Sequence, residues 1–253
     1  MDIARVVDIY FADDDSFGSG YALTDRLILT AAHVAAAALP GAECEIRPLT
    51  DIGAHLTATL LRRWDDHDAA LLELNEGYAL PRFQDEIVRF GRAGEGDDNI
   101  YSCRAIGFPY ATSFDGVRQE WELRGRLIRG IRARRYAVEP ENAVPAGADQ
   151  WPGFSGAAVF CKTLLVGIVQ AVATSFDGRM LQALPIDVLL SDQDFVVLLA
   201  AGMGRKPVLK TTQARGQLGK VGKLSQRIGP TRGCRGAAPG RWMARRLSRR
   251  QAP

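Results

Sequence analysis

The chain has 253 residues, 47% of them hydrophobic, which is enough to bury the core of one sizeable domain or of two small ones. No apolar run approaches the length of a membrane-spanning helix, and the first residues show no basic region followed by an apolar stretch, so we expect neither a membrane span nor a Sec-type signal. The net charge of +3 is unevenly distributed: residues 205–253 hold fourteen Lys and Arg and no Asp or Glu, whereas the rest of the chain carries a net charge of −11.

From about residue 3 to residue 186, short apolar runs are separated by turn residues. The runs include YALTDRLILTAAH, HLTATLLRRW, HDAALLELNE, YSCRAIGFP, QEWELRGRLIRGI, SGAAVFCKTLLVGIVQAVA and GRMLQALPI. Strand candidates at such short intervals predict an all-β sandwich or a pair of barrels rather than βαβ units. The hexapeptide ATSFDG occurs at 111–116 and at 173–178, and its Asp-Gly pair favours a tight hairpin turn at each place.

The apolar period changes near the end of this region, in PIDVLLSDQDFVVLLAAG. The new spacing predicts a helix over about 187–201, with Ser191 or Asp192 as a break and Gly202 or Gly204 as its end. The basic segment 205–253 has few apolar residues and is expected to be a disordered tail. It could bind nucleic acid or an anionic membrane, act as a linker or remnant, or be a functionless extension; the absence of interleaved aromatic residues disfavours nucleic-acid binding.

Four cysteines are present, and none lies in a C-x-x-C pair or beside a histidine at metal-ligand spacing. We therefore expect no metal site and no cofactor. Reduced core thiols in a cytoplasmic protein are the favoured interpretation, and a disulfide framework is the alternative.

Three fragments carry the chemistry. GSGYALTDRLILTAAHVA places His33 directly after an apolar strand, DDHDAALLEL places Asp68 at the head of another, and PGFSGAAVF places Ser155 before a third. In this order the fragments resemble the chymotrypsin-like (trypsin-fold) serine peptidases over about residues 6–190, and the T-A-A-H at 30–33 is the most specific match. The Pro-Gly-x-Ser-Gly form is more similar to bacterial, HtrA-type peptidase domains than to the secreted digestive enzymes.

The resemblance implies a role for each residue. Ser155 is expected to be the nucleophile and His33 the base that takes its proton, since a serine hydroxyl is a poor nucleophile until it is deprotonated. Asp68 is expected to orient the imidazole and stabilise its charged form. The backbone N–H groups of Gly153 and Ser155 are implied to form the oxyanion hole.

Asp68 competes with two acidic neighbours, Asp65 and Asp66. We select Asp68 because the run that follows it, D-x-A-L-L-x-L, copies the register of the family. A turn carboxylate without a catalytic role is the alternative for Asp68, and a plain turn serine is the alternative for Ser155.

The resemblance also implies the architecture, which is two six-stranded antiparallel β-barrels with the triad between them and a C-terminal helix. We expect a peptidase domain over 1–204, with the first barrel at about 1–95 and the second at about 96–186, divided at the linker-like sequence GRAGEGDD.

Two positions near Ser155 bear on activation and on substrate specificity. Phe154 stands where the secreted branch of the family has the aspartate that pairs with a freed N-terminus, so we expect no activation by N-terminal insertion. Asp149 lies six residues before Ser155, and at that offset trypsin-like members bind Lys or Arg of the substrate. Substrate binding by Asp149 and a solvated loop carboxylate are therefore both open.

These features predict a serine endopeptidase that acts on polypeptides, with regulation by a protein partner as an open question. The alternatives are a catalytically silent binding module with a peptidase fold and a nucleic-acid binder driven by the tail.

Overall fold

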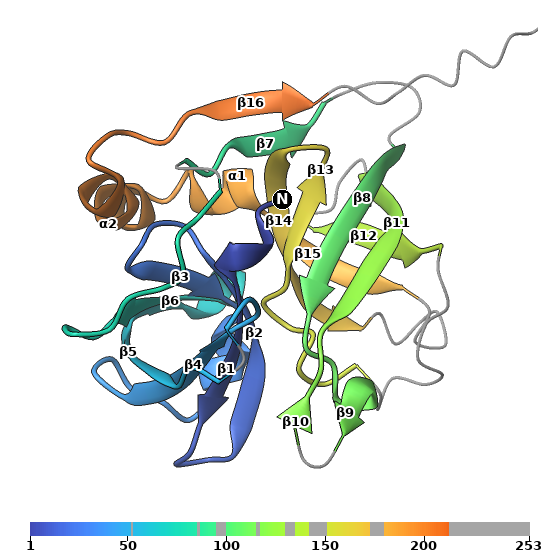
Figure 1. Ribbon diagram of the computed structural model, residues 1–253. Helices are drawn as coiled ribbons and strands as arrows, with labels where there is room; N and C mark the ends of the chain where they lie inside the picture. The colour runs from blue at the N-terminus through green and yellow to red at the C-terminus, as the bar shows by residue number, and fades with distance from the viewer. Residues whose placement is uncertain are drawn as a thin grey trace, which may run out of the picture. The chain divides into compact units, whose positions relative to one another are not determined.

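The structure is a computed structural model, and it describes residues 1–51, 53–84, 87–94, 100–114, 117–129, 135–141, 151–172 and 180–212. Within these ranges the chain is built mainly of strands, with two short α-helices and four short 3-10 helices (Figure 1). Among the described helices none is both long enough and apolar enough to span a bilayer.

The first barrel is closed by six antiparallel strands in the order β1-β2-β3-β6-β5-β4. The strands are β1 (Val6–Phe11), β2 (Ser16–Ala22), β3 (Leu27–Thr30), β4 (Glu43–Pro48), β5 (Leu56–Trp64) and β6 (Ala69–Leu74). Side chains on β4 and β5 alternate between buried and more exposed positions, as expected for strands with one face toward a core. Residues such as Ile9, Ile28, Ile46 and Leu72 point inward and fill the interior.

The second barrel follows the order β13-β8-β11-β12-β15-β14 and is closed by the pairing of β13 with β14. Its strands are β8 (Ile100–Gly107), β11 (Trp121–Arg129), β12 (Tyr136–Pro140), β13 (Ala158–Cys161), β14 (Leu164–Val172) and β15 (Leu181–Pro185). The prediction of two six-stranded antiparallel barrels is therefore confirmed.

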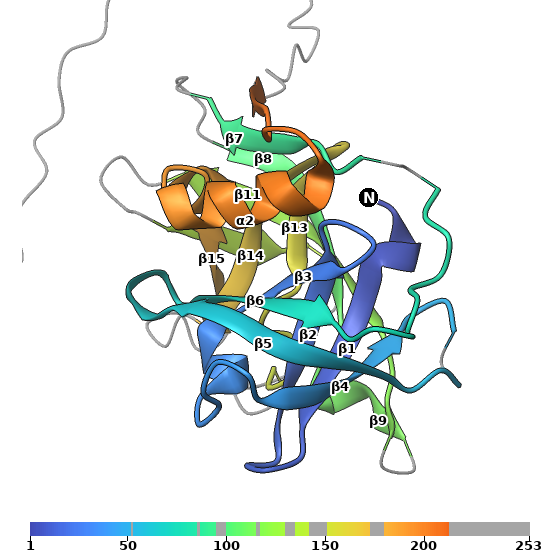
Figure 2. The ribbon, with the colours of Figure 1, turned by 90° about the vertical axis from the view of Figure 1, so that its left-hand side faces the viewer.

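A further apolar cluster joins the two barrels. Tyr21 of β2 contacts Phe160 of β13 with ring centroids 5.2 Å apart, and both side chains are buried. Because aromatic pairs bury large areas in a defined geometry, this contact helps to fix one barrel against the other, and hence the residues that each supplies to the space between them. Figures 1 and 2 show the two barrels packed side by side.

The expected C-terminal helix is divided into α1 (Ile186–Leu189) and α2 (Gln193–Met203). The break lies where Asp192 caps α2, since its carboxylate accepts the Phe195 N–H at 2.9 Å. Gly204 ends α2 with a φ of +64°. The remaining helices are the 3-10 turns η1 (Ile3–Arg5), η2 (Ala32–Ala35), η3 (Asp65–His67) and η4 (Tyr110–Thr112).

Two strands depart from the predicted boundaries. β7 (Phe90–Ala93) lies before the expected division at residue 95, yet it pairs in parallel with β14 of the second barrel. β16 (Leu209–Thr212) lies in the segment expected to be disordered, yet it pairs in parallel with β7 over four residues. Composition missed β16 because this strand is ordered by backbone pairing with a distant partner rather than by apolar content of its own, and it missed β7 because four residues are too few to show a strand pattern.

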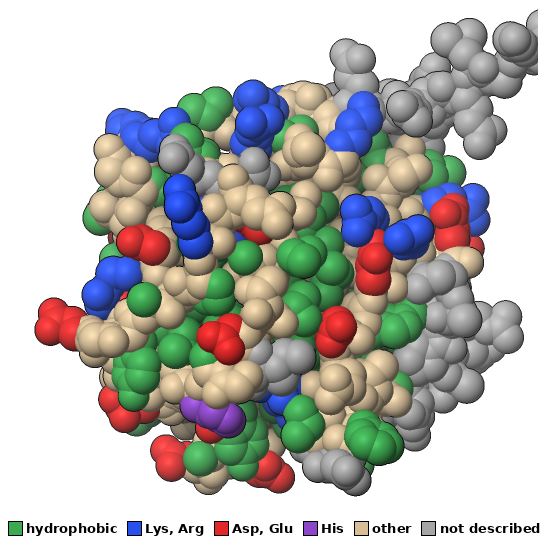
Figure 3. Space-filling view, in the orientation of Figure 1, with side chains coloured by type: hydrophobic (Ala, Val, Ile, Leu, Met, Phe, Trp, Pro, Cys, Tyr) green, Lys and Arg blue, Asp and Glu red, His purple; other side chains and the backbone are tan. Residues whose placement is uncertain are grey.

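Lys and Arg side chains gather along the upper edge of the face in Figure 3, where β7 and β16 lie. The residues of the tail beyond Thr212 lie outside the described part of the chain. The first ATSFDG repeat contains β9 (Ser113–Phe114), which pairs with β10 (Val117–Arg118) as expected for a hairpin. Its Asp-Gly pair and the whole of the second repeat lie outside the described residues.

Candidate active site

His33 and Asp68 are brought together by two turns of the first barrel. His33 lies in η2, directly after β3, and Asp68 follows η3 with a left-handed φ of +51°. The Asp68 carboxylate accepts the His33 backbone N–H at 3.0 Å, and it contacts the ring nitrogen Nδ1 through both oxygens at 2.9 and 3.0 Å. Asp65, by contrast, pairs with Arg63. The structure thus pairs His33 with Asp68, which is the aspartate that the register of the following apolar run selected.

The Asp68 contact determines the state of the imidazole. An ionised carboxylate only accepts hydrogen bonds, so the proton of a neutral His33 ring is held on Nδ1. The other ring nitrogen, Nε2, is then free to accept a proton. The His33 side chain is 46% exposed and that of Asp68 is 23% exposed, so the pair lies at the rim of the protein and is open to a substrate.

Ser155 stands on a tight turn between the described segment that begins at Trp151 and strand β13. The turn is closed by hydrogen bonds from the Phe154 N–H to the Trp151 carbonyl at 3.0 Å and from the Ala157 N–H to the Phe154 carbonyl at 3.1 Å. Gly153 has a φ of +93°, and a Cβ at this position would lie 2.3 Å from the carbonyl oxygen of Phe108. Glycine is therefore required here for both backbone conformation and space.

Two backbone N–H groups beside Ser155 donate no hydrogen bond within the described residues, namely those of Gly153 and Ser155 itself. The Pro152 carbonyl accepts the Tyr110 N–H at 2.7 Å. Because a trans peptide directs its C=O and N–H to opposite sides, this bond turns the Gly153 N–H away from Tyr110. Unpaired N–H groups of this kind are suited to binding a developing negative charge.

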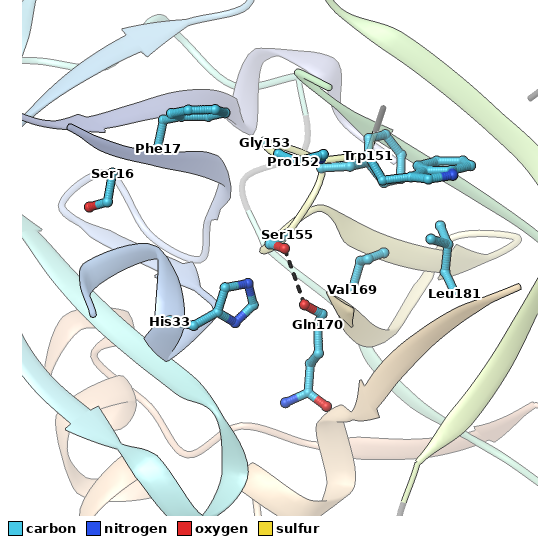
Figure 4. A pocket seen from close by; sticks show the side chains of 11 residues that line it. Ser16, Phe17, His33, Trp151, Pro152, Gly153, Ser155, Val169, Gln170 and Leu181 are labelled. Carbon is cyan, nitrogen blue, oxygen red and sulfur yellow. Dashed lines mark hydrogen bonds between the residues drawn. The ribbon is translucent and has the colours of Figure 1, made fainter. Parts of the chain in front are cut away.

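A cavity of about 410 Å³ opens at these residues. Its lining consists of Ser16, Phe17, His33, Trp151, Pro152, Gly153, Phe154, Ser155, Val169, Gln170 and Leu181. Figure 4 shows the His33 ring and the Ser155 hydroxyl facing the same space, with Trp151, Val169 and Leu181 together on one side of Ser155 and Phe17 on the other. Of the described lining residues only His33 is ionisable.

The Ser155 hydroxyl donates to the backbone carbonyl of Gln170 at 3.1 Å (Figure 4). Among the described residues it has no hydrogen bond to His33. A bond from Ser155 to Nε2 of His33 therefore requires a movement of the serine hydroxyl or of the imidazole.

Ser19 connects the serine turn to the first barrel, and its role was not predicted. Its buried hydroxyl donates to the Gly153 carbonyl at 2.6 Å and accepts the Phe108 N–H at 2.9 Å. Its backbone N–H donates to the Ser155 carbonyl at 2.7 Å. The Gly-Ser-Gly sequence at 18–20 marks the position, but its letters do not reveal that the hydroxyl reaches across to a segment 134 residues away.

Phe154 is buried, with ring centroids 5.5 Å from Trp151 and 5.9 Å from Trp121. The residue that stands where the secreted enzymes have an aspartate is thus an apolar anchor of the turn. Asp149 lies outside the described residues, so its predicted contact with substrate stays a prediction.

Solved structures similar to this chain are bacterial and Deg-type proteases. The Rv3671c protease of M. tuberculosis in its active form is 18% identical, with a TM-score of 0.53 over 81% of this chain and 83% of the other. A serine endoprotease from Yersinia pestis is 18% identical, with a TM-score of 0.56 over 81% and 65% of the two chains. Deg5 is 20% identical, with a TM-score of 0.53 over 79% and 90%. These likenesses show a shared fold.

The comparison with curated proteins found no match. The family model described as "Trypsin-like peptidase domain" matches residues 18–168, which is more than half of the chain and spans His33, Asp68 and Ser155. The chain therefore belongs to the trypsin-like peptidase domain family and is a serine-type endopeptidase.

Proposed function

We propose that the protein cleaves peptide bonds through a catalytic triad of His33, Asp68 and Ser155. The observation that carries the proposal is the Asp68 carboxylate on Nδ1 of His33, which leaves Nε2 free beside Ser155 in one cavity. The N–H groups of Gly153 and Ser155, which have no partner among the described residues, support it further, because they are suited to form an oxyanion hole at the nucleophile.

In the first half of the reaction the Ser155 hydroxyl leaves the Gln170 carbonyl and turns toward His33. Its oxygen attacks the carbonyl carbon of the scissile peptide while its proton passes to Nε2. The N–H groups of Gly153 and Ser155 bind the oxyanion. Collapse of the tetrahedral intermediate breaks the C–N bond, and His33 returns the proton to the leaving amine.

In the second half a water molecule attacks the acyl-serine ester. His33 takes a proton from this water and then gives it to the Ser155 oxygen, which restores the enzyme. Asp68 stabilises the imidazolium in both halves and stays ionised. Removal of a triad member is expected to lower kcat by roughly 10⁴-fold or more.

The substrate is a polypeptide, and the lining of the cavity favours an apolar residue on the acyl side of the cleaved bond. Trp151, Val169 and Leu181 provide apolar walls on one side of Ser155 (Figure 4). Peptides that differ only at this residue test the assignment: Leu or Phe should be cleaved faster than Lys or Arg. A preference for Lys and Arg would instead support recognition by Asp149.

A silent binding module is not favoured, because the residues of the triad are all present and the N–H groups beside the serine donate no bond within the described ranges of the chain. We also propose that the protein is a bacterial enzyme located in the cytoplasm. The three described cysteines, Cys44, Cys103 and Cys161, are buried free thiols, which fits a reducing compartment.

Cleavage of an unfolded protein such as casein tests the function. The wild type should produce peptides, and Ser155→Ala and His33→Ala should not. Two matched controls, Ser102→Ala on an exposed position of β8 and His55→Ala at an exposed pair with Glu45, should retain full activity. Equal cleavage by Ser155→Ala and wild type would refute the proposal.

A further inference from the structure

Gln170 occupies a β-bulge beside the serine turn. On β14, Val169 pairs with Ala183 of β15 and Ala171 pairs with Gln182, so Gln170 between them has no partner on β15. A bulge of this kind redirects a side chain and removes a backbone carbonyl from the sheet ladder. Both consequences are visible: the Gln170 carbonyl accepts the Ser155 hydroxyl, and its side chain leaves the second barrel toward the first.

The side-chain amide of Gln170 binds the turn that carries Asp68. Its nitrogen Nε2 donates to the backbone carbonyl of His67 at 2.5 Å and to that of Asp68 at 3.1 Å. These bonds join residues more than a hundred positions apart in the chain and connect β14 to the end of η3. Gln170 is only 1% exposed, so its end of both bonds is shielded from water, whereas His67 and Asp68 are half-buried.

The hydrogen-bond partners of the Gln170 side chain show that its amide acts as a donor. Two carbonyl oxygens can be bound only by the NH₂ group, which fixes the orientation of the amide. Its oxygen Oε1 is then buried with no hydrogen-bond partner within the described residues. A buried acceptor without a partner is destabilising, so general stability does not explain a glutamine at this position.

Asp68 needs such an external hold because its own backbone is in the left-handed region, which non-glycine residues rarely adopt. Its carboxylate can contact both His33 Nδ1 and the His33 backbone only while this turn keeps its shape. We propose that Gln170 is a positioning residue that holds the Asp68 turn against β14 and so keeps His33 aligned with Ser155. This inference rests on the triad proposed above.

The test replaces Gln170 by Met, which keeps the volume and removes the donors. The matched control is Gln182→Met on the neighbouring strand, where the side chain is exposed. Gln170→Met should lower kcat and the rate of labelling by a fluorophosphonate by about 10²-fold with an unchanged KM, since small misplacements of catalytic groups have effects of this size. Gln182→Met should match the wild type. Gln170→Glu, which keeps the shape but cannot donate when ionised, provides a second variant in case Gln170→Met does not fold.

A readout that is independent of activity separates this inference from the proposed function. The proton on His33 Nδ1, held by Asp68, gives a downfield proton NMR resonance that should be lost or broadened in the folded Gln170 variants and kept in Gln182→Met. If folded Gln170 variants keep both the resonance and the labelling rate of the wild type, the inference is wrong while the triad stands. If the wild type is not labelled at all, the triad fails, and the resonance alone decides the role of Gln170.

Discussion

Gly153→Ala is predicted to damage catalysis through a displacement that can be estimated from the structure. The added Cβ would lie 2.3 Å from the Phe108 carbonyl oxygen, whereas such contacts stay above 3.0 Å, so the backbone must move by about 0.7 Å. The φ of +93° adds strain on the order of 1–3 kcal/mol for a residue other than glycine.

This backbone movement displaces the Gly153 nitrogen or an atom bonded next to it. Oxyanion donors act at about 2.7–3.1 Å, so a shift of this size weakens or removes one donor, which costs roughly 10²- to 10³-fold in kcat. Steady-state cleavage of a fluorogenic peptide measures this loss, and thermal unfolding measures the strain separately.

Gly77→Ala is the matched control. Gly77 has a similar φ of +86°, but a Cβ there meets no atom within 4 Å. It should therefore lose stability without losing kcat. The reasoning is refuted if folded Gly153→Ala keeps the kcat of the wild type, or if Gly77→Ala loses as much activity.

Three further predictions concern stability and reactivity. Ser19→Ala leaves a buried carbonyl and a buried N–H without partners, so it should lower the free energy of unfolding by about 1–3 kcal/mol and kcat with it, as urea titration and peptide cleavage would show. Burial raises the pKa of the Cys44 and Cys161 thiols to about 12, so at pH 8 only about one thiol in 10⁴ is ionised; iodoacetamide should modify both residues only after denaturation, and rapid modification of Cys44 or Cys161 in the native protein, identified by mass spectrometry, would contradict their burial. Phe195→Ala removes a fully buried ring that packs edge-on against a tryptophan, and it should cost about 3–5 kcal/mol, whereas Val197→Ala at a 54% exposed position of the same helix should cost little; equal losses of melting temperature would count against the proposed packing.

The parts of the fold that depend on local pattern could be predicted from the sequence. Apolar runs separated by turn residues predicted an all-β sandwich or a pair of barrels, and the resemblance to trypsin-fold peptidases implied two six-stranded barrels. Ser191 or Asp192 was expected as the break in the C-terminal helix. The register of the apolar run after Asp68 selected it from three neighbouring aspartates, and the structure places its carboxylate on His33. In each case the informative residues lie within a few positions of one another.

The features that were missed depend on partners far away in the chain. The bulge at Gln170 arises from the pairing of β14 with β15, and its amide contacts a turn 102 residues earlier. The hydroxyl of Ser19 likewise acts on Gly153. β16 has little apolar character, and its order comes from pairing with β7. A single sequence contains no local signal for any of these contacts.

Covalent labelling by a fluorophosphonate probe, with the modified residue identified by mass spectrometry, tests the central claim most directly. The probe reacts with a serine only when a neighbouring base and an oxyanion hole activate it. Our account predicts one adduct per molecule, on Ser155, lost in Ser155→Ala and strongly slowed in His33→Ala and Asp68→Asn. An absence of labelling in the folded wild type, or a rate that is unchanged when His33 is removed, would contradict it.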